Sequence, residues 1–389
     1  MDNESIVFTL FLIFSGAALV ATLALSLRQS LIIAYIALGL LIGPSGFGLI
    51  HDPALIQNIS SIGIMFLLFL LGLNLNPQDL FQTALETSLV TGVSSLILLL
   101  LGFAYSQLAG FSSVEAWVIG SALMFSSTII GLKLIPTTIL HHQHTGEMMI
   151  SVLLLQDIIA IVLLLALESY SQATAGWGGM ILPLVALPML VLVTYLVEKY
   201  LLMRLIRAFD RIQEYIFLLA IGWCLGVAEA AELLGLSYEI GAFIAGVSIA
   251  RSPIALFIAD NLKQLRDFFL IIFFVSLGAN FDLSSLQQIW LAALGLVVLA
   301  VMVKPLLYRA MLRFSKESSA RSTEVAVRLG QMSEFSLLLA VLATELNVIG
   351  GEAGSLIQLA TLLSFILSSS YVVMKYPTPI ALNDRLRRD

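Results

Sequence analysis

Charged residues are scarce in this sequence. Asp, Glu, Lys and Arg together make up 11% of the 389 residues, whereas soluble domains carry about a quarter. Hydrophobic residues account for 59%, and the mean hydropathy is +1.02. This balance excludes an ordinary soluble globule and gives no sign of a nucleic-acid partner. It predicts a protein that crosses the lipid bilayer several times.

Cysteine is nearly absent as well. The single cysteine, Cys224, excludes an intrachain disulfide, and because it lies in an apolar segment we interpret it as a packing residue. The N-terminus lacks the basic residues of a signal peptide, since Asp2 and Glu4 precede the first apolar run. We therefore expect that run to be a retained membrane span.

Long apolar runs, in contrast, are abundant. A helix needs about 20 mostly apolar residues to cross the hydrocarbon layer. The runs between polar breaks predict an all-α polytopic membrane protein with thirteen transmembrane helices. Their ranges are 5–26, 30–48, 56–73, 87–109, 116–135, 147–168, 179–200, 213–233, 237–250, 266–280, 287–310, 324–345 and 354–375.

The distribution of basic residues predicts the orientation of these spans. If the N-terminus is outside, the inner loops and their helix ends collect all but one of the 19 Lys and Arg residues, as the positive-inside rule requires. The exception is Lys304, which lies within a span. The outer loops hold acidic residues such as Asp52, Glu115 and Glu229. We therefore expect a cytoplasmic C-terminus.

An odd number of spans favours two inverted-topology repeats within one transmembrane domain, 1–389. If the seventh span, about 179–200, is a linker helix, repeat one covers about 1–170 and repeat two about 213–375, and the two repeats enter the membrane from opposite sides. Residues 376–389 then form a cytoplasmic tail. Inverted repeats are typical of secondary transporters, whose binding sites lie near the bilayer midplane.

A carboxylate interrupts the sixth span. In the stretch LLLQDIIAIVLLL, Asp157 lies about ten residues from either end of the span, which is about 15 Å from each face of the membrane. A carboxylate at that depth is costly unless it is protonated, solvated or paired, so we expect a functional group. The alternative is a hydrogen-bonded carboxylic acid that joins two helices.

Asp157 predicts an exchange site for a proton and a cation, because one carboxylate holds either but not both. Gln156 places a neutral amide oxygen beside it, suited to a weakly hydrated monovalent cation. Since a single acid is present at this depth, the pattern favours one proton per cation and therefore electroneutral exchange.

Two further spans carry polar residues where an unbroken helix would not. We expect the fifth and twelfth spans to be interrupted, because irregular backbone at membrane depth occurs where it lines a cavity. The alternative is that the hydroxyl groups bond back to carbonyls of their own helix. The candidate residues at these two points are Ser126, Ser127, Thr128, Gln331, Ser333 and Glu334.

Lys304 allows two interpretations. Its side chain can extend to the cytoplasmic interface, or it can reach inward to compensate the negative helix ends or to meet Glu334. The loop HHQHTGE, with His141, His142 and His144, can be a metal or pH-sensing cluster or a solvated loop.

Seven motifs distributed along the chain resemble those of one transporter family. They are YIALGLLIGPSGFGL, IGIMFLLFLLGLNLNP, ALMFSSTIIGLKLI, LLLQDIIAI, GAFIAGVSIA, FFVSLGANFDL and GQMSEFSLLL. Together they resemble the membrane domain of the Kef-type potassium/proton antiporters, in the second monovalent cation:proton antiporter family. The resemblance implies a homodimer in which a core domain with two crossed, discontinuous helices slides past a dimerisation domain.

The resemblance also implies roles for individual residues. Asp157 would be the exchange carboxylate and Gln156 its partner, while the stretches Ser126–Thr128 and Gln331–Glu334 would form the helix crossing and Lys304 the core-domain lysine. Two departures stand out. Asn74 and Asn76 replace acids that Kef proteins tend to carry, and no regulatory nucleotide-binding domain follows the last span, so such a domain would be separate or missing.

These features together predict a K⁺/H⁺ antiporter of a bacterial inner membrane, with an elevator-type mechanism and without a cofactor or resident metal. Na⁺/H⁺ exchange is the alternative, and an organic-anion symporter is a more distant one, since it would need more positive charge at the site than Lys304 supplies. An enzyme is not expected: an intramembrane aspartyl protease needs two aspartates, and Asp157 is the only aspartate placed at the midplane. A channel filter built from repeated carbonyls is not evident.

Overall fold

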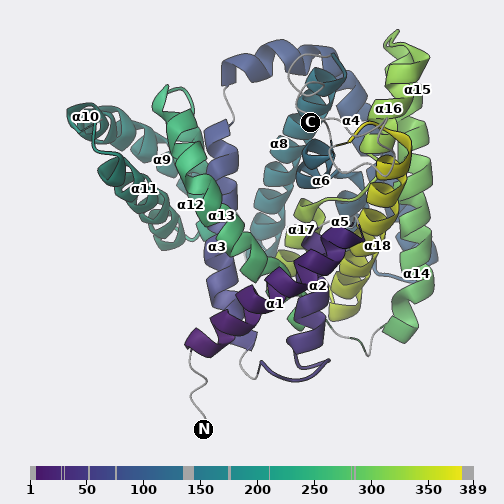
Figure 1. Cartoon of the computed structure of the whole chain (residues 1–389). Helices are drawn as coiled ribbons and strands as arrows, with labels where there is room; N and C mark the ends of the chain where they lie inside the picture. The colour runs from purple at the N-terminus through teal and green to yellow at the C-terminus, as the bar shows by residue number, and fades with distance from the viewer. Residues whose placement is uncertain are drawn as a thin grey trace. The chain divides into compact units, whose positions relative to one another are not determined.

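The computed structural model describes residues 6–27, 29, 31–50, 53–74, 77–134, 144–173, 177–209, 211–281, 283 and 286–378. Its elements are helices joined by short connections (Figure 1). The chain divides into two compact units that interleave along the sequence. Unit 1 comprises Met1–Ala18, Tyr35–Leu80 and Leu165–Asn280, and unit 2 comprises Leu19–Ala34, Phe81–Leu164 and Phe281–Asp389.

Two sets of helices make up these units, and α1 (Ile6–Ser26) and α2 (Leu31–Ile42) contribute residues to both. Unit 1 holds mainly α3 (Pro53–Asn74), α9 (Trp177–Val197), the π-helical η1 (Glu198–Leu202), α10 (Met203–Ala208), α11 (Gln213–Leu233), α12 (Tyr238–Ile249) and α13 (Ile254–Ala279). Unit 2 holds mainly α4 (Pro77–Leu108), α5 (Ser113–Met124), α6 (Thr128–Lys133), α8 (His144–Ala173), α14 (Leu286–Val298), the π-helical η2 (Leu299–Val303), α15 (Lys304–Phe314), α16 (Ser319–Arg328), α17 (Glu334–Glu345) and α18 (Gly351–Lys375).

Many of these helices have the length and composition of membrane spans. Within the described residues, seven helical stretches are long and apolar enough to cross a bilayer: Ile6–Ser26, Ser88–Leu108, Met148–Leu167, Val185–Ala208, Gln213–Leu233, Leu286–Phe314 and Gly351–Lys375. Shorter apolar helices occupy Leu31–Ile42, Ile59–Leu73, Ser113–Met124 and Tyr238–Ile249. The chain is therefore an all-helical membrane protein, and the number of thirteen spans stays a prediction.

Several helices differ in extent from the predicted spans, and α4 begins at Pro77 rather than at 87. Helix α13 begins at Ile254 rather than at 266, because its first turns carry polar residues such as Asp260 and Lys263 that an apolar window excludes but an exposed helix face accepts. Helix α2 ends at Ile42 rather than at 48. The next residues, Gly43 and Pro44, open a turn, and Pro44 has no N–H to continue a helix.

Small residues set the packing inside unit 1. Helix α3 lies against α12 and α13 (Figure 1), and Gly72 of α3 meets Gly246 of α12. A Cβ atom added to Gly72 would lie 2.5 Å from the Phe243 carbonyl oxygen, so a side chain at this position would force the helices apart. Small residues permit such close helix packing in membranes, where apolar burial between helices gives little driving force.

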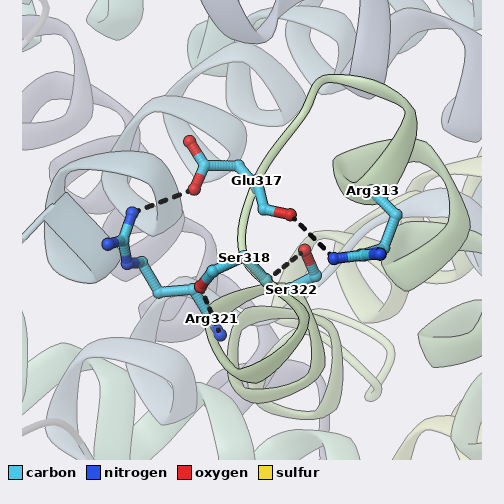
Figure 2. Close-up of polar contacts among 5 residues, drawn as sticks. All are labelled: Arg313, Glu317, Ser318, Arg321 and Ser322. Carbon is cyan, nitrogen blue, oxygen red and sulfur yellow. Dashed lines mark hydrogen bonds and ion pairs between the residues drawn. The ribbon is translucent and has the colours of Figure 1, made fainter.

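A tight connection joins α15 to α16 in unit 2 (Figure 2). Arg313 donates to the Glu317 carbonyl oxygen at 3.3 Å, and the Glu317 carboxylate forms an ion pair with Arg321 at 3.0 Å. The Ser318 hydroxyl caps α16 by accepting from the Arg321 N–H at 3.4 Å. This connection brings α16 back alongside α15, so the break that follows α16 lies near the start of α15.

Candidate functional site

Both predicted interruptions are present in unit 2. Helix α5 ends at Met124 and α6 begins at Thr128, and α16 ends at Arg328 before α17 begins at Glu334. Between each pair of half-helices the backbone is extended, as at Phe125 (φ −76°, ψ 142°) and Ser333 (φ −126°, ψ 158°). Each break leaves backbone groups of the helix ends in need of partners.

Lys304 satisfies three of these backbone groups. It is fully buried, and it follows the π-helical turn η2. Its Nζ donates to the carbonyl oxygens of Leu123 at 3.2 Å, Phe125 at 2.6 Å and Gln331 at 2.9 Å. The ammonium group thus uses its three donors and places positive charge at the negative end of α5. Of the two interpretations from the sequence, the side chain reaches inward.

Gln156 is bonded to the same helix end from α8. Its Oε1 accepts from the Ser126 N–H at 3.0 Å, and its Nε2 donates to the Met124 carbonyl oxygen at 2.8 Å. A second Nε2 contact, at 2.6 Å, reaches the Tyr308 hydroxyl. The two backbone partners fix which side of the amide is oxygen. A flipped amide would place its NH₂ group against the Ser126 N–H and its oxygen against the Met124 carbonyl oxygen.

Two serine hydroxyls connect the interrupted helices directly. Ser336 of α17 donates to the Ala122 carbonyl oxygen at 2.6 Å, and Ser126 donates to the Leu329 carbonyl oxygen at 2.9 Å. Successive carbonyls at the end of α5 therefore have side-chain partners from α17, α15 and α8. The broken backbone can be buried because side chains distant in sequence replace the missing helical bonds.

Asp157 lies next to this framework and is 2% exposed. The Thr128 hydroxyl donates to its Oδ1 at 3.4 Å, whereas Oδ2 has no hydrogen-bond partner in the described part of the chain. The Glu334 carboxylate is close enough to interact electrostatically with that of Asp157. A buried carboxylate with an unpartnered oxygen is chemically equipped to take up a proton or a cation.

The remaining predicted residues form the starts of the second half-helices. The Ser127 hydroxyl accepts from the Ile130 N–H at 3.0 Å, and the Ser333 hydroxyl accepts from the Phe335 N–H at 3.2 Å. These hydroxyls cap α6 and α17. Glu334 is buried in the first turn of α17, where the helix dipole favours negative charge.

Helix α18 supplies polar partners that the sequence reading did not single out. Ser368 donates to the Gln331 Oε1 at 2.9 Å, and Ser364 accepts from the Met332 N–H at 3.0 Å. Tyr308 was also missed, although its place four residues after Lys304 on one helix face could have indicated it. The α18 serines gave no comparable signal, because hydroxyls in apolar helices commonly bond within their own helix.

The structure thus gathers every predicted site residue into unit 2, but it does not extend to the histidine loop. His141 and His142 lie outside the described residues, and His144 begins α8. Within the residues that the structure describes, His, Cys, Asp and Glu side chains form no group of three or more that could hold a metal ion.

Comparison with known proteins agrees with this arrangement. Residues 12–374 match the sequence model of the family described as Sodium/hydrogen exchanger, transmembrane. The chain is 26% identical to the iron transporter MagA of Paramagnetospirillum magneticum, covering 91% of this chain and 82% of that protein. It is 28% identical to the putative cation/proton antiporter YbaL of Escherichia coli K12, covering 90% of this chain and 65% of that protein.

The glutathione-regulated potassium-efflux protein KefC of Escherichia coli is also 28% identical, over 94% of this chain and 59% of KefC. The chain spans less than two thirds of the length of YbaL and of KefC. The family match and these relatives confirm that its motifs resemble those of the Kef-type antiporters. The fold is similar to that of the sodium proton antiporter MjNhaP1 of Methanocaldococcus jannaschii, with a TM-score of 0.70, 20% identity and coverage of 94% of this chain and 96% of that chain. This chain belongs to the sodium/hydrogen exchanger transmembrane family.

Proposed function

We propose that this protein is a monovalent cation/proton antiporter that exchanges K⁺ for H⁺ at Asp157, with Na⁺ as the alternative cation. The observation that carries the proposal is the buried Asp157 carboxylate, whose Oδ2 has no hydrogen-bond partner within the described residues. The family membership and the relatives named as cation/proton antiporter and potassium-efflux protein support it.

The charges around Asp157 favour this chemistry. Lys304 supplies one positive charge, and its ammonium group donates its three hydrogen bonds to backbone carbonyl oxygens. The lysine therefore compensates the negative charge of the helix ends. Asp157 is left to bind either a proton or a cation. We propose that Gln156 completes the site as a neutral neighbour that holds the end of α5 without adding charge.

The site lies in one unit, which supports an elevator-type mechanism. The hydrogen bonds among Asp157, Gln156, Lys304 and the two breaks are formed by residues of unit 2. We propose that unit 2 carries the bound proton or cation as one body, and that the protein is a homodimer in a bacterial inner membrane with its N-terminus outside.

The test is exchange in proteoliposomes that contain an internal pH dye. With a proton gradient imposed, addition of K⁺ or Na⁺ should change the internal pH in the wild type, and Asp157→Asn should abolish the response. Asp260→Asn, which alters an exposed acid of α13, serves as the matched control and should retain it. Substantial exchange in Asp157→Asn at normal protein yield would refute the proposal.

A further inference from the structure

Arg328 is a buried charge that the exchange chemistry does not use. Its side chain is 1% exposed, and it is the last residue of α16, directly before the second break. Arg321, about two turns earlier in the same helix, is 45% exposed and forms an ion pair with Glu317. The positive-inside rule accounts for exposed arginines such as Arg321, but it gives no reason to bury one.

The guanidinium of Arg328 has partners on several elements. Its Nε and one terminal nitrogen donate to Glu324 at 3.1 and 2.9 Å. The other terminal nitrogen donates to the Leu134 carbonyl oxygen at 2.9 Å, and the Pro377 carbonyl oxygen is a further acceptor at 2.9 Å. The Tyr376 ring lies 5.5 Å from the guanidinium carbon. A planar group with five donors can serve these acceptors together, whereas a lysine ammonium cannot.

The segments that Arg328 contacts are adjacent in sequence to the two helix breaks. Leu134 follows α6, the short helix whose first residue, Thr128, donates to Asp157. Arg328 itself precedes Leu329, whose carbonyl oxygen accepts from Ser126, and Gln331, whose carbonyl oxygen accepts from Lys304. One side chain therefore joins the far end of α6 to the first residue of the second break.

The segment after α18, which holds Tyr376 and Pro377, is also connected to the site. Tyr376 and Pro377 follow α18, which holds the second break through Ser364 and Ser368. Arg328 thus lies outside the site itself, and it holds the elements whose residues contact Asp157 and Lys304.

We propose that Arg328 is a positioning residue for ion exchange, which sets the geometry of the Asp157 site by holding α6, α16 and the segment after α18 together. The proposal rests on the proposed antiport function. It assigns Arg328 no contact with the transported ion.

The test compares Arg328→Lys with Arg321→Lys in the full-length protein. In the proteoliposome assay, Arg328→Lys should raise the apparent KM for the exchanged cation about tenfold, as expected for losing charge-assisted hydrogen bonds that hold the site, with a smaller change in maximum rate. Arg321→Lys should leave both values unchanged. An unchanged KM with a lower maximum rate or lower yield would mean that Arg328 is structural only, and would overturn the proposal.

A second variant and a hydrogen-exchange measurement test the same role of Arg328. If Arg328→Lys does not fold, Tyr376→Leu removes the aromatic partner more gently and should shift the KM in the same direction by a smaller factor. Hydrogen exchange should be faster at residues 329–334 and 128–134 in either variant than in the wild type, and unchanged protection would contradict the proposed coupling. Because this readout does not require transport, it separates failure of the Arg328 proposal from failure of the antiport function.

Discussion

Gln156 shows how a residue that was expected beside the ion acquires a second task in the fold. Its amide oxygen accepts a backbone N–H, and its amide nitrogen donates to a carbonyl and to Tyr308. Each of these bonds depends on the amide having one donor side and one acceptor side. The chemistry that makes glutamine neutral therefore also makes it suitable to hold the end of α5.

This arrangement predicts the behaviour of Gln156→Glu. An ionised Glu would place a carboxylate oxygen against the Met124 carbonyl oxygen, where Nε2 now donates, so we expect exchange to fall about tenfold or more at high pH. As the pH falls, the protonated form regains a donor. The activity of the variant relative to the wild type should therefore rise, as measured by the proteoliposome assay over a pH series.

The control for this prediction is Gln107→Glu, at an exposed position of α4, which should follow the wild-type pH profile. A constant ratio between Gln156→Glu and the wild type over the pH series would show that the donor side of the amide does not matter.

At the scale of elements, the two interrupted helices depend on each other. Ser126 of the first break bonds to Leu329 of the second, and Ser336 of α17 bonds to Ala122 of α5. Each bond replaces one that a continuous helix would have made within itself. The half-helices are therefore stabilised as a pair.

We expect Ser126→Ala and Ser336→Ala each to destabilise the protein by about 1 kcal/mol, because each leaves a buried carbonyl without its donor. The combined variant should lower both the melting temperature in detergent and the exchange rate further than either single change. Ser106→Ala provides the control, since the Ser106 hydroxyl is also buried but bonds to Gly102 of its own helix. Equal effects of Ser106→Ala and the combined variant would argue against mutual support of the breaks.

At the scale of the whole molecule, the proposed transport cycle is set by the charge of the site. If unit 2 carries Asp157 either protonated or paired with one monovalent cation, the moving body has the same net charge in both directions. Lys304 does not alter this balance, because its partners are backbone carbonyls.

This charge balance predicts electroneutral exchange. The rate of the internal pH change should be the same whether the membrane potential is clamped at zero or held at a large negative value with an ionophore. A rate that follows the potential would require a second titrating group. Glu334, which interacts electrostatically with Asp157, would then be the first residue to replace.

The sequence by itself determined the membrane class and the positions of both helix breaks, and it singled out Asp157 as a carboxylate within an apolar span. These features follow from local composition, since hydropathy and the cost of polar groups in lipid are read along a single segment. The tertiary structure alone decided between the alternatives for Lys304, gave Gln156 its partners and buried Arg328. Those outcomes depend on residues far apart in the chain, as when Lys304 reaches the carbonyl of Leu123, 181 positions away. A composition pattern within one helix does not specify which distant backbone group a long side chain will meet.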